Sequence, residues 1–174
     1  MFKKISQPFK NKLADKQYGF SNLATLAIML LIAFGVSQYQ QRHMTQGQAP
    51  TLHGIDYSQG PTLVYFWASW CAVCQTTSNS VSTLAKKTKN DTISGQVISV
   101  ALSSGRDNEI TRYQQQQGYQ FKTINDDQGL ISQQWGVAVT PSFFIIDTQG
   151  NIHSTSTGIT SPWGMKLRLW LAKN

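Results

Sequence analysis

The sequence predicts an α/β domain with a mixed central sheet flanked by helices, preceded by one transmembrane helix. A long uncharged and mostly apolar segment lies near the N-terminus and indicates the membrane helix. From residue 62 onward, short apolar runs typical of strands alternate with amphipathic segments, and a hairpin and a final helix follow. Outside the apolar segment roughly 130 residues remain, enough for one compact domain with its own core.

The N-terminal segment has the features of a membrane anchor. No residue between Lys16 and Arg42 is charged, and about 20 apolar helical residues suffice to cross a bilayer. We therefore expect a cytoplasmic basic tail at 1–19 and a transmembrane anchor at 20–39. Five lysines precede the span, so the positive-inside rule predicts a single-pass protein of the inner (cytoplasmic) membrane whose domain faces the periplasm or the cell exterior. A cleaved signal peptide is the alternative.

The remainder of the chain divides into a polar connector at 40–60, rich in Gln, Gly and Pro, and a domain at 61–174. Residues 45–174 carry nine Lys or Arg against seven Asp or Glu, a net charge of only +2. A nucleic-acid partner requires a basic patch on the folded domain, and this balance leaves little room for one. We expect no nucleic acid among the partners.

The first half of the domain contains two strand–helix pairs. In order, we predict a central strand, a helix, a second buried strand and a second helix, at 62–67, 74–89, 97–102 and 107–116. Val81 and Leu84 are the expected inward residues of the first helix. Asp107 or Ser104 is expected to cap the second helix, because short polar side chains accept hydrogen bonds from its first N–H groups.

The second half contains a short strand, a short helix, a strong strand and its antiparallel partner, at 122–124, 129–135, 142–147 and 152–157. A turn at 148–151 joins the last two. A final helix opens at Ser161 or Pro162. Its predicted apolar stripe consists of Trp163, Leu167, Trp170 and Leu171.

The chain has two cysteines, Cys71 and Cys74, directly after the first strand and at the start of a helix. Unpaired N–H groups and the helix dipole stabilise a thiolate there. The spacing of three places both sulfurs on one face, close enough for a disulfide. Cys71 is the predicted nucleophile, and the more buried Cys74 resolves the mixed disulfide. Zinc needs about two further ligands, and the three histidines show no paired spacing, so we predict no metal and no cofactor beyond the cysteines.

The segment Phe66-Trp67-Ala68-Ser69-Trp70-Cys71-Ala72-Val73-Cys74 resembles the active-site signature of the thioredoxin superfamily. Val139-Thr140-Pro141-Ser142 resembles the cis-proline segment of that superfamily. The block 143–152 and the insertion-like helix and strand around 105–125 resemble the TlpA-like branch. Overall layout is most similar to the membrane-anchored suppressor-of-copper-sensitivity D proteins of that branch. The similarity covers roughly residues 50–172.

The resemblance implies a thioredoxin-like fold and adds Trp70, Thr140 and Pro141 to the site as substrate-binding residues. It implies a cis Thr140–Pro141 bond, a type nearly confined to proline. The loop would lie against the cysteines, and the Thr140 backbone would pair with an extended substrate segment. Two positions depart from relatives that carry carboxylates to help deprotonate the resolving cysteine: here they are Tyr65 and Thr77.

The leading functional hypothesis is a membrane-anchored thiol–disulfide oxidoreductase that exchanges disulfides with protein thiols and disulfides of the cell envelope. A membrane electron donor is implied if it works as a reductant. One alternative is a thioredoxin-like binding module in which the cysteines are minor. Another is a copper-handling protein that uses Cys71 and Cys74 as soft thiolate ligands.

Overall fold

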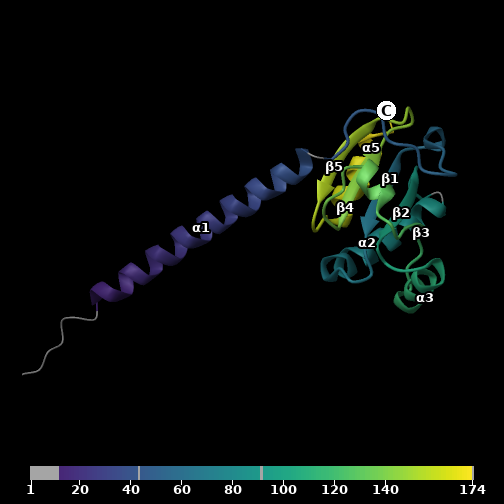
Figure 1. The fold of residues 1–174 in the computed structure, drawn as a ribbon. Helices are drawn as coiled ribbons and strands as arrows, with labels where there is room; N and C mark the ends of the chain where they lie inside the picture. Colours follow the sequence, from purple (N-terminus) through teal and green to yellow (C-terminus); the bar gives the residue numbers. More distant parts are fainter. Residues whose placement is uncertain (1–11, 43, 91, 174) are drawn as a thin grey trace, which may run out of the picture. The chain divides into compact units, whose positions relative to one another are not determined.

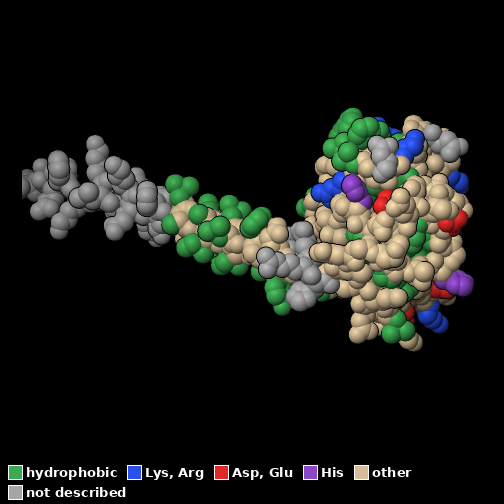
Figure 2. Space-filling view, turned by 90° about the horizontal axis from the view of Figure 1, so that it is seen from above, with side chains coloured by type: hydrophobic (Ala, Val, Ile, Leu, Met, Phe, Trp, Pro, Cys, Tyr) green, Lys and Arg blue, Asp and Glu red, His purple; other side chains and the backbone are tan. Residues whose placement is uncertain are grey.

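The computed structural model describes the backbone of residues 12–42, 44–90 and 92–173. The chain forms two units, Met1–Tyr39 and Gln40–Asn174. Most of the first unit is helix α1 (Lys12–Arg42), and its side chains from Leu23 to Val36 are exposed (Figure 2). The predicted anchor at 20–39 falls within α1, although the side chains of 20–22 lie outside the described residues, as do residues 1–11 of the predicted tail. Within the described part of the chain, no helix combines the length and apolarity that a membrane crossing requires.

The second unit is built on one five-stranded sheet in the order β3-β2-β1-β4-β5 (Figure 1). Its strands, in chain order, are β1 (Thr62–Trp67), β2 (Gln96–Leu102), β3 (Lys122–Asp126), β4 (Ser142–Ile146) and β5 (Ile152–Thr157). The first three run parallel, whereas β4 is antiparallel to β1 and β5 is antiparallel to β4. The predicted mixed sheet flanked by helices is thus confirmed.

Strand β1 is buried along its whole length because both faces of the sheet are covered. Side chains alternate between the faces. Leu63, Tyr65 and Trp67 enter one core, which is covered by α2 (Ala72–Lys89), α3 (Asp107–Gln117) and α5 (Pro162–Leu171). Val64 and Phe66 enter a second core on the other face, next to the short helix α4 (Leu130–Gln134).

Residues 44–60, a connector by composition, are part of this second core. Met44 and Leu52 are buried with Trp135. The Thr45 N–H donates to the Trp135 carbonyl at 3.1 Å, and Gln48 forms a β-bridge with Asn151. The apolar side chains that do this stand singly among polar ones, so no periodic pattern in the sequence revealed them.

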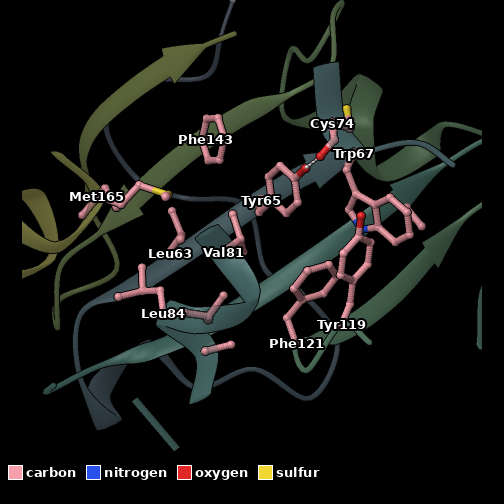
Figure 3. Packing of buried hydrophobic residues seen from close by; sticks show 14 of the residues in the cluster. Leu63, Tyr65, Trp67, Cys74, Val81, Leu84, Tyr119, Phe121, Phe143 and Met165 are labelled. Atoms are coloured by element: carbon pink, nitrogen blue, oxygen red, sulfur yellow. Dashed lines mark hydrogen bonds between the residues drawn. The ribbon is translucent and has the colours of Figure 1, made fainter. Parts of the chain in front are cut away.

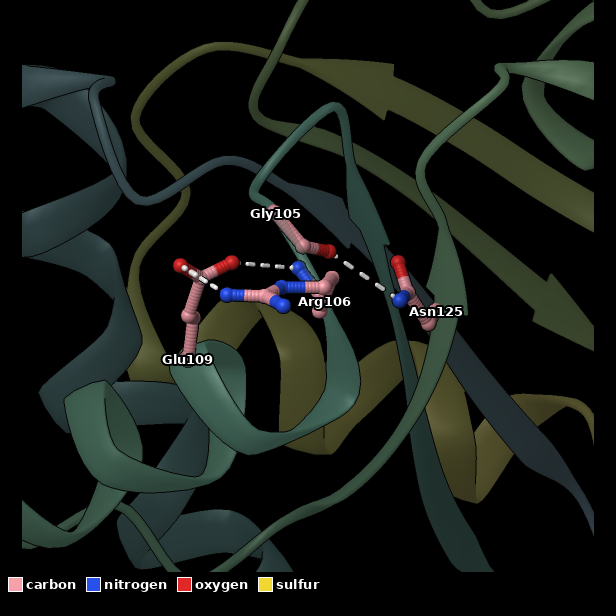
Figure 4. A network of polar contacts seen from close by, with 4 residues as sticks. All are labelled: Gly105, Arg106, Glu109 and Asn125. Atoms are coloured by element: carbon pink, nitrogen blue, oxygen red, sulfur yellow. Dashed lines mark hydrogen bonds and ion pairs between the residues drawn. The ribbon is translucent and has the colours of Figure 1, made fainter.

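The start of α3 differs from the prediction. Its N-cap is Arg106 rather than Asp107 or Ser104. Figure 4 shows the reason: the Arg106 N–H donates to the Glu109 carboxylate at 2.8 Å, and the Asn125 amide donates to the Gly105 carbonyl at 3.1 Å. These bonds fix the turn before the helix without a side-chain cap from a short polar residue.

The apolar stripe predicted for the last helix was wrong. Ser161 caps α5 as expected, with its Oγ accepting from the Gly164 N–H at 3.0 Å. However, the buried residues are Met165, Leu169 and Ala172. The four predicted residues, Trp163, Leu167, Trp170 and Leu171, are exposed. The helix has apolar side chains on two faces, and a spacing of three to four residues fits both.

The burial of Leu52, which is 3% exposed, leads to a testable prediction. Truncating Leu52 to Ala should lower the free energy of unfolding by about 2–5 kcal/mol, because it opens a cavity in the second core. The neighbouring His53 is exposed, and His53→Ala should stay within about 0.5 kcal/mol of the parent protein. Urea unfolding of both variants measures the difference. Equal stabilities for the two would show that the segment is a loose connector.

Candidate active site

The two cysteines meet at the junction between β1 and α2. Cys71 is the N-cap of α2, and its Sγ accepts a hydrogen bond from the Cys74 N–H at 3.2 Å. The two sulfurs are joined in a disulfide. Cys71 is 8% exposed and Cys74 only 1%, so the sulfur predicted to attack is the more accessible one. Helix α2 begins two residues earlier than predicted, which places Cys71 at its positive end.

The proline loop lies beside the first cysteine. The Thr140–Pro141 bond is cis, as predicted, and the Thr140 carbonyl oxygen is 3.6 Å from the Cys71 Sγ. Strand β4 starts directly after this loop, and Ser142 pairs with Phe66 near the end of β1. The sheet register therefore brings three of the predicted site residues, Cys71, Thr140 and Pro141, together.

Trp70 stands at the rim of the site. Its side chain is 65% exposed, and its Nε1–H donates to the Ser103 carbonyl at 3.0 Å. The preceding residue is tied to the same loop, because the Ser69 N–H donates to the Ser104 Oγ at 2.9 Å. Ser103 has a φ of +42°, a left-handed conformation that is uncommon outside glycine. Sequence reasoning assigned neither serine to the site, since they belong to no motif, and it considered Ser104 only as a helix cap.

The two positions that depart from carboxylate-bearing relatives are in contact with each other beneath the disulfide. The Tyr65 hydroxyl lies 3.3 Å from the Cys74 carbonyl, 3.3 Å from the Thr77 Oγ1 and 2.9 Å from the Ser78 Oγ. Figure 3 shows the ring reaching toward Cys74 from β1. Ser78 was not anticipated, although Cys74, Thr77 and Ser78 are spaced i, i+3 and i+4 and share one face of α2.

These hydroxyls stay protonated at neutral pH. Tyr65 is fully buried and stacks on Phe143 with ring centroids 5.0 Å apart. Burial raises the pKa of Tyr65 to about 12, although the hydrogen bonds to Ser78 and Thr77 oppose the rise. Of the carboxylates in the described part of the chain, none hydrogen-bonds with Tyr65, Thr77 or Ser78. A neutral hydroxyl cluster occupies this place.

Among the residues that the structure describes, no group of three or more His, Cys, Asp or Glu side chains could hold a metal ion.

Comparisons with known proteins agree with this geometry. The model of the AhpC/TSA family matches residues 39–155. A thioredoxin-like protein of Haemophilus influenzae is 38% identical over 128 residues, which cover 74% of this chain and 72% of the relative. The thiol:disulfide interchange protein DsbE of Xylella fastidiosa is 27% identical over 101 residues, 57% of this chain and 48% of that protein.

Solved structures share the fold. A thiol:disulfide interchange protein of the thioredoxin family from Chlorobium tepidum superimposes with a TM-score of 0.61 at 17% identity, over 74% of this chain and 97% of that one. The family match spans most of the chain and includes both cysteines and the cis-proline loop. The chain therefore belongs to the AhpC/TSA family, and it is a thiol–disulfide oxidoreductase of the thioredoxin type with Cys71 and Cys74 as its CxxC pair.

Proposed function

We propose that this protein is held in the cytoplasmic membrane by residues 20–39 and exchanges disulfides with proteins on the far side of that membrane. The environment of the Cys71 sulfur supports the catalytic part of this proposal. The Cys71 Sγ occupies the N-terminus of α2, 3.2 Å from the Cys74 N–H, with the Thr140 carbonyl 3.6 Å away. The N–H and the helix dipole stabilise a thiolate, which is the nucleophile of disulfide exchange.

The reaction uses both cysteines in sequence. In the reduced protein the Cys71 thiolate attacks one sulfur of a substrate disulfide. That bond breaks, and the other substrate sulfur leaves as a thiolate that takes up a proton. The Cys74 thiolate then attacks the Cys71 Sγ and releases the second substrate sulfur, leaving the Cys71–Cys74 disulfide. Two electrons pass to the substrate, and the reverse sequence oxidises a dithiol.

Exposed apolar side chains around the disulfide favour polypeptide substrates. Trp70 and Val73 flank Cys71 and are 65% and 42% exposed. Ile159 is 74% exposed and follows Gly158, whose N–H donates to the Pro141 carbonyl at 2.9 Å. Such a rim fits an extended segment with apolar side chains whose backbone pairs with Thr140. Unfolded or newly exported proteins present segments of this kind.

The anchor is supported by the charge pattern of the sequence and by the exposed apolar side chains of α1. Leucine, isoleucine and phenylalanine side chains between residues 23 and 34 are more than half exposed, and an apolar surface of that extent requires a cover. Lipid is the cover that an uncharged segment of this length fits. For a reductant outside the cytoplasm, electrons must come through the membrane, so a membrane thiol donor to the Cys71–Cys74 disulfide is part of the proposal.

The hydroxyl cluster supplies no base that could take the proton of Cys74. A tyrosine with a pKa of about 12 cannot act as a base at neutral pH, whereas a carboxylate could. Tyr65 is therefore a positioning residue that holds the Cys74 carbonyl and the first turn of α2. The proton of Cys74 passes to solvent or to the departing substrate thiolate.

The cysteine roles are tested by trapping. With Cys74→Ser, the attack by Cys71 can proceed but resolution cannot, so a stable mixed disulfide with insulin should accumulate under non-reducing electrophoresis. Cys71→Ser should form no adduct and show no insulin reduction. An adduct formed through Cys74 in the Cys71→Ser protein would reverse the roles, and partner binding without turnover in the wild type would favour the binding module.

The protonation state of Tyr65 is tested by alkaline unfolding. A raised pKa in the folded state stabilises the protein below pH 10, and this contribution is lost as the pH rises through 12. Between pH 10 and 12 the parent protein should therefore lose up to about 2–3 kcal/mol more stability than Tyr65→Phe. The comparison variant is Tyr57→Phe, which removes a hydroxyl bonded to the Pro50 carbonyl, remote from the disulfide. Burial raises the pKa of Tyr57 to about 12 as well, so this variant should also lose less stability than the parent at alkaline pH. Only Tyr65→Phe should also alter the rate of insulin reduction.

Topology is tested with a C-terminal reporter. Alkaline phosphatase fused after residue 174 folds only where disulfides form, so it should be active in the full-length fusion. Removing the lysines at 3, 4, 10, 12 and 16 should reduce that activity, because the orientation signal is lost. Fractionation should find the fusion in the membrane. A released form shortened by the first 36–40 residues would establish a cleaved signal instead.

A further inference from the structure

Helix α5 exposes an apolar surface that the exchange reaction does not use. Trp163, Leu167 and Trp170 are 79%, 55% and 61% exposed and recur at i, i+4 and i+7, so they share one face of the helix. Exposed Lys166 and Lys173 flank them. We call these five residues the α5 surface. The opposite face of α5 is buried in the first core through Met165 and Leu169, so the α5 surface is not needed to hold the helix in place.

A groove runs along this surface. It has a volume of about 360 Å³ and lies between α5 and the loop Thr92–Ser94. A smaller groove of about 170 Å³ continues it toward α2, where Lys87 joins the lining. Figure 2 shows apolar and basic side chains gathered next to one another on the surface of the domain. The groove is therefore lined by apolar side chains and bordered by basic ones.

The charged side chains that the structure describes along the groove are all basic. Lys87, Lys166 and Lys173 line it, and the Lys166 Nζ lies 5.5 Å from the centre of the Trp163 ring. Of the acidic side chains that the structure describes, none lines either groove; Asp91, next to the loop in sequence, lies outside the described residues. The surface is therefore complementary to an anionic partner.

We propose that the α5 surface docks on the headgroup layer of an anionic lipid bilayer. Tryptophan is the side chain that prefers this layer, because its ring is apolar and its N–H is polar. Lysines beside it keep their charge at the headgroups while their stems cover apolar surface. A protein partner or a second copy of the chain would be expected to bury the aromatic centre with fewer lysines in it.

The location of the surface suits a domain that works while docked. The loop Thr92–Ser94 lies at the start of β1, since the Gln96 N–H donates to the Pro61 carbonyl at 3.0 Å, whereas Cys71 follows the end of β1. Docking through this end leaves the disulfide at the opposite end of the strand. The proposal rests on the anchor of the proposed function. Four residues, 40–43, separate the proposed anchor from the buried Met44. A tether of that length keeps the α5 surface at high effective concentration near lipid.

The experiment uses the full chain in vesicles of phosphatidylcholine and phosphatidylglycerol with brominated acyl chains, which quench only tryptophans that enter the bilayer. Two of the five tryptophans lie on the α5 surface. The wild type should be quenched, and the residual fluorescence of Trp163→Phe/Trp170→Phe should not be. Lys166→Glu/Lys173→Glu should lose most of the quenching, because each lysine near an anionic surface contributes roughly a fivefold factor in affinity. The charge-matched control, Arg112→Glu/Lys122→Glu, alters α3 and β3 and should be quenched like the wild type.

The outcomes separate docking from the proposed function. Flotation of the vesicles reports the anchor, and insulin reduction by the same samples reports the catalytic pair. A chain that floats and reduces insulin but is not quenched overturns docking alone. Quenching that survives Lys166→Glu/Lys173→Glu, or that appears equally in vesicles of phosphatidylcholine only, overturns the anionic lipid as the partner. A doubled mass in detergent that is lost in Trp163→Phe/Trp170→Phe overturns it in favour of a second copy of the chain.

Discussion

The active site depends on one hydrogen bond, from the Cys74 N–H to the Cys71 Sγ at 3.2 Å. It exists because a strand that is buried on both faces ends at Trp67, four residues before Cys71, and a helix starts directly after Cys71. Strand β1 fixes the position of the turn, because all of its side chains are packed against one core or the other. Helix α2 then offers the N–H groups that its first turn cannot use internally. A thiolate at this point replaces the oxygen of an ordinary helix cap, so the reactive form of the cysteine is also the form that completes the helix.

The same junction explains why the core of this protein is polar beneath the disulfide. Cys74, Thr77 and Ser78 face inward from α2, and Tyr65 meets them from β1. A carboxylate here would have to be desolvated, which costs stability but supplies a base. The hydroxyl cluster satisfies its members with hydrogen bonds at no such cost. These hydrogen bonds tie the first turn of α2 to β1, and in the proposed mechanism Cys74 passes its proton to solvent or to the departing thiolate.

The sequence was informative where a short segment of the chain has one strongly preferred local structure. Strand β1 and the CxxC turn follow from short-range sequence patterns. The cis Thr140–Pro141 bond was implied only by the resemblance to the thioredoxin superfamily, because an X–Pro bond by itself allows either isomer. The sequence was misleading where the same spacing of apolar residues fits two different orientations of a helix. The residues of α5 repeat every three to four positions on both faces, so periodicity could not say which face the sheet would bury. The resemblance implied a role for Trp70 but no partner for it, because Ser103 and Ser104 approach from a loop more than thirty residues away.

That covering segment links the fold to the proposed location of the protein. The second core is incomplete without Met44, Ala49 and Leu52, so the chain is part of the domain almost from the point where the proposed anchor ends. A long free connector would let the disulfide sample a wide volume and any orientation. With the proposed anchor, a short connector would restrict the domain to the membrane surface, where one of its sides would repeatedly meet headgroups. The α5 surface has the side chains suited to that contact, and the disulfide lies at the other end of β1, so restriction by the anchor and access to Cys71 are compatible.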